Sequence, residues 1–576
     1  MKIINLKIQN YRNLDGVELI FHPDINFIIG ENNLGKSNLL KLLNILFNQQ
    51  RFKEDDFYNS DRAIEVEFSL ELETLEIGMF NDLFDPENSH ILNIVAVQES
   101  VDDNLEFKHK ESGSFIPRAD LKCINYIDYD SLRNPSSELK FDKIKGAGKF
   151  LNYIVFKYLE NSQTQDLDFI DKSKINELLL EVTGNLQKIK PFKDFFIEAI
   201  LENNQENLLT KLIILADDQK RRLENLSYGV QFYSLIPLAL LEKLLSLNNK
   251  KNFKKCIFED ESTAEKCLPI LIGLDEPEIH LHPYAQRALV KYLKKIVINE
   301  DKDFSELLRT LFSIDRLLGQ IIIVSHSPSI LLDDYKKIIR FYVDINDKKL
   351  TVKSGKEIVL EKKTEKQLLR NLPYIKEAFF SKVVILVEGD SELGAFPVFV
   401  QKMNINLDEL GISIIKAGSP HSIVPLMNLL KKFGILSVGI MDSDQKKIYE
   451  SKKIENLFFT ELEDFEDEIF NSLDLLDYIL YVESETPKKL KFMVQKAQQL
   501  VSTTIDHNKS LYSQFKNLNQ EQIKKLKFES KEEILKILRN TKTIINGRYL
   551  AEQLDEIPQI YQTVIKTAEE LSNYVK

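Results

Sequence analysis

Tryptophan is absent from this 576-residue sequence, and cysteine is limited to Cys123, Cys256 and Cys267. Three thiols spread this widely argue against a disulfide framework and against a zinc site, and they favour a reducing, cytoplasmic compartment. No apolar run approaches the ~18 residues that a membrane-spanning helix needs, so we expect no membrane contact. The chain starts directly with a strand-like pattern, without the apolar region of a signal peptide.

Positive charge is also in deficit. The 77 Lys and Arg residues are outnumbered by 89 Asp and Glu residues, which gives a formal net charge of −12. Nucleic-acid-binding proteins usually carry a basic excess, so any contact with DNA must use a local patch. The lysine runs that could form one are Lys431 and Lys432, Lys446 and Lys447, Lys488, Lys489 and Lys491, and Lys524, Lys525 and Lys527. Such runs are equally typical of solvated helix faces, and both interpretations stay open.

The length predicts three or four domain-sized units, because one hydrophobic core does not extend over 576 residues. Short apolar strands alternate with amphipathic helices in most of the chain, which is typical of the α/β class. Helical spacing replaces this pattern between residues 139 and 223, with one helix expected from Ile175 to Leu186 and another from Phe195 to Leu201. This insert either only packs on its neighbours or serves dimerisation.

A glycine-rich loop follows the short apolar strand expected from Ile25 to Ile29. It reads Gly30-Glu31-Asn32-Asn33-Leu34-Gly35-Lys36-Ser37 and runs into an amphipathic helix that extends to about Phe47. This order of strand, loop and helix is the context of a P-loop. Backbone N–H groups then surround the phosphates, the lysine reaches the terminal ones and the serine binds Mg2+. The predicted ATP and Mg2+ ligands are Gly30, Asn32, Asn33, Gly35, Lys36 and Ser37.

A carboxylate pair ends a second apolar strand, expected from Pro269 to Leu274. Asp275 would take part in the Mg2+ shell, and Glu276 would polarise the water that attacks the γ-phosphate. The stretch from Asp275 to Pro283 resembles the RecF, SMC and OLD branch of ABC-type ATPases. Together with the glycine loop, the pair predicts an ATPase.

Two shorter motifs complete the order of an ABC-type ATPase. Ser227 and Gly229 open a helix in Leu226-Ser-Tyr-Gly-Val-Gln231, which is similar to the ABC signature that meets the nucleotide of a second protomer. A helix N-terminus with these residues suits an anion. His326 follows the strand from Gln320 to Val324, and we expect it to contact the γ-phosphate. Gln98 is the candidate for the Q-loop glutamine.

A second group of acids follows further along the chain. Glu388 and Glu392 flank a glycine turn after the apolar strand Val383 to Val387, and Asp442 and Asp444 follow another strand about fifty residues later. Acids at the carboxyl ends of parallel strands meet at one edge of a sheet, although acids after strands are also common in ordinary loops. Carboxylates favour Mg2+ or Mn2+. The arrangement resembles the Toprim fold, in which metal ions help to cut or rejoin phosphodiester bonds.

Three further residues, which do not follow these strands directly, are candidates for the same site. Asp464 and Glu466 lie in the acidic stretch Glu461 to Glu468, where they would complete a second metal site or simply solvate a helix N-terminus. Lys542 lies in a fairly apolar helical region near the end of the chain. A cation there could offset charge on the transition state.

An SMC/RecF-like ATPase followed by a Toprim unit resembles the OLD (overcoming lysogenisation defect) family of nucleases. The resemblance implies an α/β chain with an ABC-type P-loop ATPase domain, a helical dimerisation insert, a Toprim domain with a small parallel βαβ sheet, and C-terminal helices. The boundaries implied are 1–138 and 224–355 for the ATPase, 139–223 for the insert, 356–378 for a linker helix, 379–480 for Toprim and 481–576 for the helices. The family motifs imply that Glu388, Glu392, Asp442 and Asp444 bind metal. The resemblance implies less directly that Asp464 or Glu466 is a further metal ligand and that Lys542 is a catalytic lysine.

The same resemblance implies metal-dependent nicking or cutting of DNA during phage infection, gated by ATP, in a homodimer or tetramer. The chain is also similar to the Gabija antiphage nuclease subunit, which works beside a UvrD-like helicase, and the sequence leaves this choice open. Two alternatives remain on the residues alone. One is a RecF-like ATP-dependent DNA-binding clamp whose Toprim half is an inert scaffold. The other, a topoisomerase, is disfavoured because no winged-helix-like segment adjoins the Toprim unit.

Overall fold

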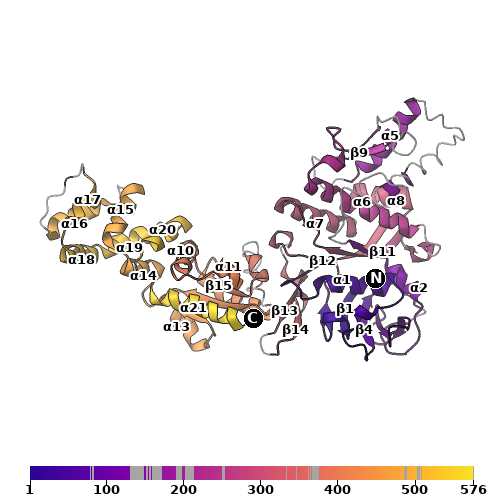
Figure 1. Ribbon diagram of the computed structural model, residues 1–576, viewed down its shortest axis with the longest axis horizontal. Helices are drawn as coiled ribbons and strands as arrows, with labels where there is room; N and C mark the ends of the chain where they lie inside the picture. Colours follow the sequence, from indigo (N-terminus) through magenta and orange to yellow (C-terminus); the bar gives the residue numbers. More distant parts are fainter. Residues whose placement is uncertain are drawn as a thin grey trace. The chain divides into compact units, whose positions relative to one another are not determined.

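The chain divides into two compact units in a computed structural model (Figure 1). The N-terminal unit comprises Met1–Tyr342 and Leu350–Ile358, and the C-terminal unit comprises Val343–Lys349 and Val359–Lys576. The structure describes residues 1–77, 79–80, 83–129, 148–150, 153–154, 157, 172–189, 197–201, 213–248, 253–331, 334–344, 347–360, 362, 365, 375–485, 490–501, 506 and 509–574.

A largely parallel sheet forms the centre of the N-terminal unit. Its strands are β3 (Ile25–Gly30), β7 (Tyr126–Tyr129), β10 (Phe258–Glu259), β11 (Lys266–Asp275), β12 (Arg316–Val324), β13 (Ile338–Val343) and β14 (Leu350–Ser354). The order is β10-β11-β12-β3-β13-β14, and β7 pairs with β11. Because β7, β11, β12, β3 and β13 pair in parallel, their carboxyl ends lie at one edge. The predicted strands at Ile25, Pro269 and Gln320 are confirmed.

The N-terminal unit also contains an antiparallel sheet, which packs on one face against the hydrophobic core beside the parallel sheet. Its strands are β1 (Lys2–Gln9), β2 (Glu18–Ile20), β4 (Ile64–Glu71), β5 (Ile91–Gln98) and β6 (Glu106–His109), in the order β2-β1-β4-β5-β6. Buried and partly exposed residues alternate along β5, as expected for a sheet that packs on one face only. The buried face shares a hydrophobic core with α1 (Lys36–Asn48), whose leucines Leu39, Leu42, Leu43 and Leu46 are fully buried.

The N-terminal unit contains further helices. They are α2 (Arg118–Leu121), α6 (Tyr228–Asn248), α7 (Pro283–Val297) and α8 (Lys302–Phe312). Helix α7 contacts β12, and α1 contacts both β3 and β11. These contacts explain why β11 and β12 are apolar and buried along nearly their whole length.

The predicted helical insert is only partly helical where it is described. Helix α5 (Lys172–Leu186) confirms the first predicted helix. The second prediction is wrong: β8 (Glu198–Leu201) pairs antiparallel with β9 (Ile213–Ala216). A short apolar run does not distinguish a strand from a helix by itself, and here the partner strand decided the outcome. Phe195 and Phe196 lie outside the described residues.

The cysteine prediction also needs correction. Cys123 and Cys256 form a disulfide bond, although 133 positions separate them in the sequence. They lie in two short 3-10 helices, η4 (Lys122–Ile124) and η7 (Phe253–Cys256), which contact each other next to the sheet. Spacing along the chain carried no information about this proximity, because the fold created it. Cys267 is free and buried.

The C-terminal unit contains a small, fully parallel sheet. Its strands are β15 (Val383–Val387), β16 (Ile412–Lys416), β17 (Leu436–Met441) and β18 (Leu457–Phe459), in the order β16-β15-β17-β18. All neighbouring pairs are parallel, which confirms the predicted βαβ sheet. The carboxyl ends of the four strands therefore form one edge, which we call the Toprim edge.

Helices make up the rest of this unit. Those between and just after the strands are α10 (Asp390–Lys402), α11 (Leu407–Leu410), α12 (Pro420–Lys432), α13 (Lys446–Tyr449) and α14 (Phe465–Ser472). The C-terminal set is α15 (Leu475–Glu485), α16 (Lys491–Val501), α17 (Leu511–Phe515), α18 (Gln520–Glu529), α19 (Lys531–Arg539), α20 (Ile544–Gln553) and α21 (Gln559–Tyr574). The last helix, α21, lies against β15 and β17 (Figure 1). Within the described ranges no helix has the length and apolar character needed to cross a membrane.

Candidate nucleotide and metal sites

The glycine-rich loop has the conformation of a phosphate cradle. Gly30 and Gly35 adopt φ values of 142° and 89°, which side chains rarely tolerate. A Cβ at Gly30 would lie 2.2 Å from the Phe341 carbonyl oxygen, and one at Gly35 would lie 2.6 Å from Asn13 Oδ1. Both glycines are therefore required by backbone geometry and close packing. Asn32 and Asn33 are exposed at the tip of the loop.

Lys36 is buried at the start of α1 and points back into the loop. Its Nζ donates to the carbonyl oxygens of Gly30, at 2.9 Å, and Glu31. Burial lowers the pKa of Lys36 to about 8, although Glu276, Asp275 and Glu31 oppose this shift. The ammonium group is therefore costly to keep charged without an anion, which suits a phosphate-binding lysine.

The strand-end carboxylates lie beside the loop, although β11 is not the neighbour of the P-loop strand β3, because β12 lies between them. Ser37 Oγ donates to Asp275 Oδ1 at 3.0 Å, so β11 and α1 present two oxygen ligands at one point. Glu276 has a φ of 46°, an unusual value for a residue with a side chain. Its Oε1 lies 3.5 Å from His326 Nε2. Burial and the charge of Lys36 lower the pKa of His326, which keeps its ring neutral near pH 7.

Glu278 is a structural member of this site that the sequence analysis did not assign. Its Oε1 accepts hydrogen bonds from Ser325 Oγ at 2.6 Å and from the His326 N–H at 2.9 Å. These bonds join the loop after β11 to the end of β12, and they hold the backbone of His326. The acid in the sequence Asp275-Glu-Pro-Glu278 was the available signal.

The signature residues lie at the exposed start of α6. A Cβ at Gly229 would lie 2.9 Å from the carbonyl oxygen of His280, so glycine permits the close approach of the loop after β11. Ser227 is exposed, and its carbonyl accepts the N–H of Gln231.

Gln98 is not placed where a Q-loop residue would act. It is fully buried in β5, where Oε1 accepts the Phe52 N–H at 2.6 Å and Nε2 donates to the Phe52 carbonyl at 3.1 Å. The prediction is wrong because a buried glutamine on an antiparallel strand serves the loop beside it. Asp128 and Tyr129, at the end of β7, line a small pocket with Ser37 and Asp275 instead.

The loop between β1 and β2 supplies further neighbours of the phosphate cradle that were missed. Arg12 NH1 donates to Asn38 Oδ1 at 2.9 Å, and its Nε donates to Asp56 Oδ1 at 2.9 Å. Asn13 accepts a hydrogen bond from Asn38 and donates to the Asn33 carbonyl at 3.4 Å. No local sequence pattern in residues 10–17 links this turn to the glycine-rich loop, because the two segments meet only in the folded chain.

The four acids predicted at the Toprim edge are brought together. Glu388 follows β15, Glu392 lies in the first turn of α10, and Asp442 and Asp444 follow β17. The Gly389 N–H donates to Glu392 Oε2 at 3.1 Å, and the Phe465 N–H donates to Asp442 Oδ1 at 3.2 Å.

Burial and repulsion between carboxylates shift the pKa values of Glu388, Glu392 and Asp442 upward. Burial, with the charges of Glu388 and Glu392, raises the pKa of Asp442 to about 8. Burial also raises the pKa of Glu392 to about 7, and it raises the pKa of Glu388 despite the nearby Lys542. Three carboxyl groups that resist ionisation together form a site that would gain from a divalent cation.

Asp464 and Glu466 are held by cationic side chains of the protein. Asp464 caps α14 through the Asp467 N–H, and its Oδ2 accepts from Arg539 Nε at 2.7 Å. Glu466 is 2% exposed; its Oε1 accepts from Ser391 Oγ at 3.1 Å, and its Oε2 lies 2.8 Å from Lys542 Nζ. Both predicted ligands are thus occupied by protein partners in this arrangement.

As the side chains stand, no group of three or more His, Cys, Asp or Glu residues within the described ranges could hold a metal ion. The donor chemistry nevertheless fits one at Glu388 and Asp442. Glu388 Oε2 is buried and has no hydrogen-bond partner among the described residues. A buried carboxylate oxygen without a partner is costly, and a hard cation is the partner that these acids would share.

Lys542 reaches the Toprim edge because α20 packs very closely on α10. A Cβ at Gly394 would lie 2.0 Å from the Ile544 carbonyl oxygen, and one at Gly547 would lie 1.9 Å from the Ser391 carbonyl oxygen. Burial opposes the charged form, but the hydrogen bond and charge of Glu466 raise the pKa of Lys542. The lysine therefore stays protonated beside the acids.

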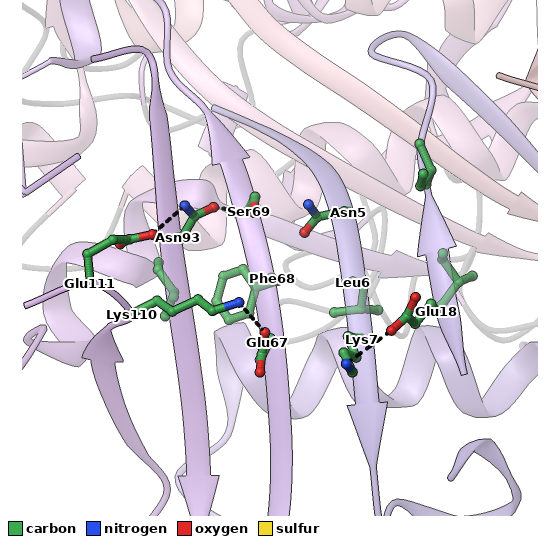
Figure 2. Close-up of a pocket in the computed structure, with 13 residues that line it drawn as sticks. Asn5, Leu6, Lys7, Glu18, Glu67, Phe68, Ser69, Asn93, Lys110 and Glu111 are labelled. Atoms are coloured by element: carbon green, nitrogen blue, oxygen red, sulfur yellow. Dashed lines mark hydrogen bonds and ion pairs between the residues drawn. The ribbon is translucent and has the colours of Figure 1, made fainter. Parts of the chain in front are cut away.

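A hollow of about 400 Å³ on the antiparallel sheet lies apart from the predicted site residues (Figure 2). Figure 2 shows two ion pairs in it, Lys110 with Glu67, at 2.6 Å, and Lys7 with Glu18, at 3.1 Å, while Glu111 accepts a hydrogen bond from Asn93. Ser69 bonds to Asn93 in the floor. None of the predicted site residues lines this hollow.

The N-terminal part of the chain matches a known family of ATPases. The family profile described as "AAA ATPase domain" matches residues 1–170 and 128–331, which together cover more than half of the chain. The chain belongs to this family. Curated relatives include the DNA replication and repair protein RecF of Staphylococcus aureus, 42% identical over 86 residues. That match covers 14% of this chain and 23% of the relative, so the chain spans about a quarter of the length of the curated relatives it matches.

A second family profile matches part of the C-terminal unit. Residues 379–444 match the TOPRIM domain of overcoming lysogenization defect protein-like proteins. The chain thus carries an ABC-type ATPase domain followed by an OLD-like Toprim domain.

Two solved structures are reported for fold comparison. The Smc head bound to the C-winged helix domain of ScpA is 15% identical, covers 63% of this chain and 100% of its own, and has a TM-score of 0.37. The C-terminal region of the Burkholderia pseudomallei OLD protein is 18% identical, covers 34% of this chain and 99% of its own, and has a TM-score of 0.22.

Proposed function

We propose that this protein is an ATP-regulated, divalent-metal-dependent DNA endonuclease that nicks or cuts DNA in antiphage defence. The observation that carries the proposal is the Toprim edge: Glu388 and Asp442 follow adjacent parallel strands, burial raises the pKa of each, and Glu388 Oε2 has no partner among the described residues. Glu388, Glu392, Asp442 and Asp444 would hold Mg2+ or Mn2+, which lowers the pKa of a bound water and polarises a phosphate.

The chain's own residues divide the remaining work. Lys542 holds a positive charge at the edge, where it offsets negative charge that develops on the phosphate. Glu466 and Ser391 fix the position of that lysine. Asp464 orients α14 and keeps Arg539 at the edge.

The ATPase half would act as a gate. Lys36 and the loop N–H groups bind the phosphates of ATP, while Ser37 and Asp275 hold its Mg2+. Glu276 orients the attacking water, and His326 contacts the γ-phosphate. Ser227 and Gly229 would meet the nucleotide of a second protomer, which implies a homodimer or tetramer. A UvrD-like helicase partner, as in Gabija systems, and a cytoplasmic location complete the proposal.

Cleavage of supercoiled plasmid with Mg2+ or Mn2+, across an ATP titration, tests this function. We expect nicked or linear product from the native protein and none from Glu388→Gln or Asp442→Asn. Full activity in both variants would sink the nuclease proposal. ATP-dependent DNA binding without cleavage under either metal would instead favour the RecF-like clamp, the activity class suggested by the RecF match.

A further inference from the structure

Two cations flank the acids of the Toprim edge, one on each side. Lys416 is the last residue of β16, and its register partner on β15 is Val387, directly before Glu388. Arg539 ends α19 and bonds to Asp464, whose neighbour Phe465 donates its N–H to Asp442. Lys416 is therefore linked to Glu388 through its strand partner Val387, and Arg539 is linked to Asp442 through the Asp464-Phe465 segment.

We propose that Lys416 and Arg539 are the phosphate contacts of a DNA strand that lies across the Toprim edge, from β16 to β18. DNA as the ligand rests on the proposed function. The strand order β16-β15-β17-β18 gives three interstrand spacings, or roughly 14 Å. At about 3.4 Å per nucleotide along a strand, this distance corresponds to roughly four nucleotides.

Both cations are available to a new anionic partner. Lys416 Nζ lies 2.7 Å from Asp390 Oδ1, and the side chains are 37% and 38% exposed. Arg539 is 31% exposed and also reaches the exposed Glu463 at 2.9 Å. The Lys416–Asp390 and Arg539–Glu463 pairs are exposed to solvent, and such pairs contribute little, about 0–1 kcal/mol, so a phosphate can compete with Asp390 and Glu463 at small cost. The guanidinium group can contact Asp464 and a phosphate together, because it has five N–H donors.

The lysine run on α18 fits this role less well. Lys527 donates to the carbonyl oxygens of Asn471 and Leu473, so it ties α18 to the end of α14. Lys524 and Lys525 are exposed on α18, which packs on α16 and α19. Lys488 and Lys489 lie outside the described residues. A local pair of cations at the acids also explains how a chain of net charge −12 could accept DNA.

The test measures DNA affinity over a series of KCl concentrations, with a labelled duplex and with Ca2+ in place of Mg2+. Each lost phosphate contact should reduce the slope of log affinity against log salt by ~0.9 on duplex DNA. We expect a reduction of ~1.8 and on the order of tenfold weaker binding for Lys416→Gln with Arg539→Gln. The charge-matched control, Lys524→Gln with Lys525→Gln, should keep the native slope.

Conservative variants separate a contact from a structural effect. Lys416→Arg and Arg539→Lys retain the charge and should retain the slope, and thermal unfolding checks that each glutamine variant is folded. A native slope in the double glutamine variant, or an equal loss in the control, overturns the proposal. Plasmid cleavage by the native protein keeps the two proposals apart. A changed slope without any cleavage refutes only the nuclease, and cleavage with an unchanged slope refutes only this surface.

Discussion

Each of the two units has acids and a lysine at the edge of a parallel sheet. The two edges differ in which groups bond to these side chains and balance their charge. We call the edge formed by the carboxyl ends of the parallel strands in the N-terminal unit the ATPase edge. There, Lys36 donates to the backbone of its own loop, and Asp275 accepts a hydrogen bond from the hydroxyl of Ser37. At the Toprim edge, burial raises the pKa of Glu388 and of Asp442, and the charge of Glu388 raises that of Asp442 further. The compensating Lys542 comes from the turn before α20, about a hundred residues after Asp442. The first edge is preorganised locally, whereas the second depends on distant packing and on an added cation.

Removing the distant cation should have the largest effect. We expect Lys542→Met to lower the single-turnover cleavage rate by ~100–1000-fold, because charge at the scissile phosphate is no longer offset. ATP binding should not change, since Lys542 belongs to the other unit. Lys536→Met, which removes an exposed cation of the preceding helix, is the control. Equal rates for the two variants would mean that the Toprim edge does not use Lys542.

Separating α20 from α10 should disrupt the same edge through packing. Gly547→Ala puts a Cβ 1.9 Å from a backbone oxygen that cannot move independently, so we expect a loss of about 3 kcal/mol or more from the free energy of unfolding of this unit. Hydrogen exchange of α10 and α20 would detect it. Gly184→Ala, in α5 and with nothing within 4 Å, should change stability by no more than ~1 kcal/mol. Similar effects at both sites would contradict the close-packed crossing.

In the N-terminal unit, a Gln98 variant distinguishes a structural from a nucleotide-binding role of this residue. Gln98→Leu leaves the buried N–H and carbonyl of Phe52 without partners, so denaturant unfolding should show a loss of about 2 kcal/mol. Affinity for ATP should stay within about twofold, because the residue lies on the antiparallel sheet. A large loss of ATP affinity with unchanged stability would restore the Q-loop interpretation.

The smallest effect concerns pH. Because burial lowers the pKa of Lys36 to about 8, the lysine is mostly charged at pH 7 and mostly neutral at pH 9. Affinity for a fluorescent ATP analogue should therefore fall by about tenfold between these values. Lys36→Arg keeps its charge over this range, so any binding that it retains should be flat with pH. A flat profile for the native protein would show that the loop does not bury its lysine.

Sequence reasoning found the elements whose signals are local. The glycine loop, the strand ends at Asp275, Glu388 and Asp442, and the short apolar strands of the parallel sheets follow from short patterns that chain geometry imposes. Its errors were non-local. The strand β8 was taken for a helix because its partner lies beyond the apolar run, and Gln98 was assigned without knowledge of the sheet it enters.

By itself, the sequence determined the P-loop, the order of its companion motifs and the identity of the Toprim acids, since these depend on residues within one strand and turn. Only the tertiary structure decided which side chains meet. It joined Cys123 to Cys256, occupied Asp464 with Arg539 and Glu466 with Lys542, and left Glu388 Oε2 without a described partner. The physical reason is that ion pairs, disulfides and desolvation depend on distances of a few ångströms between segments that the chain order leaves far apart.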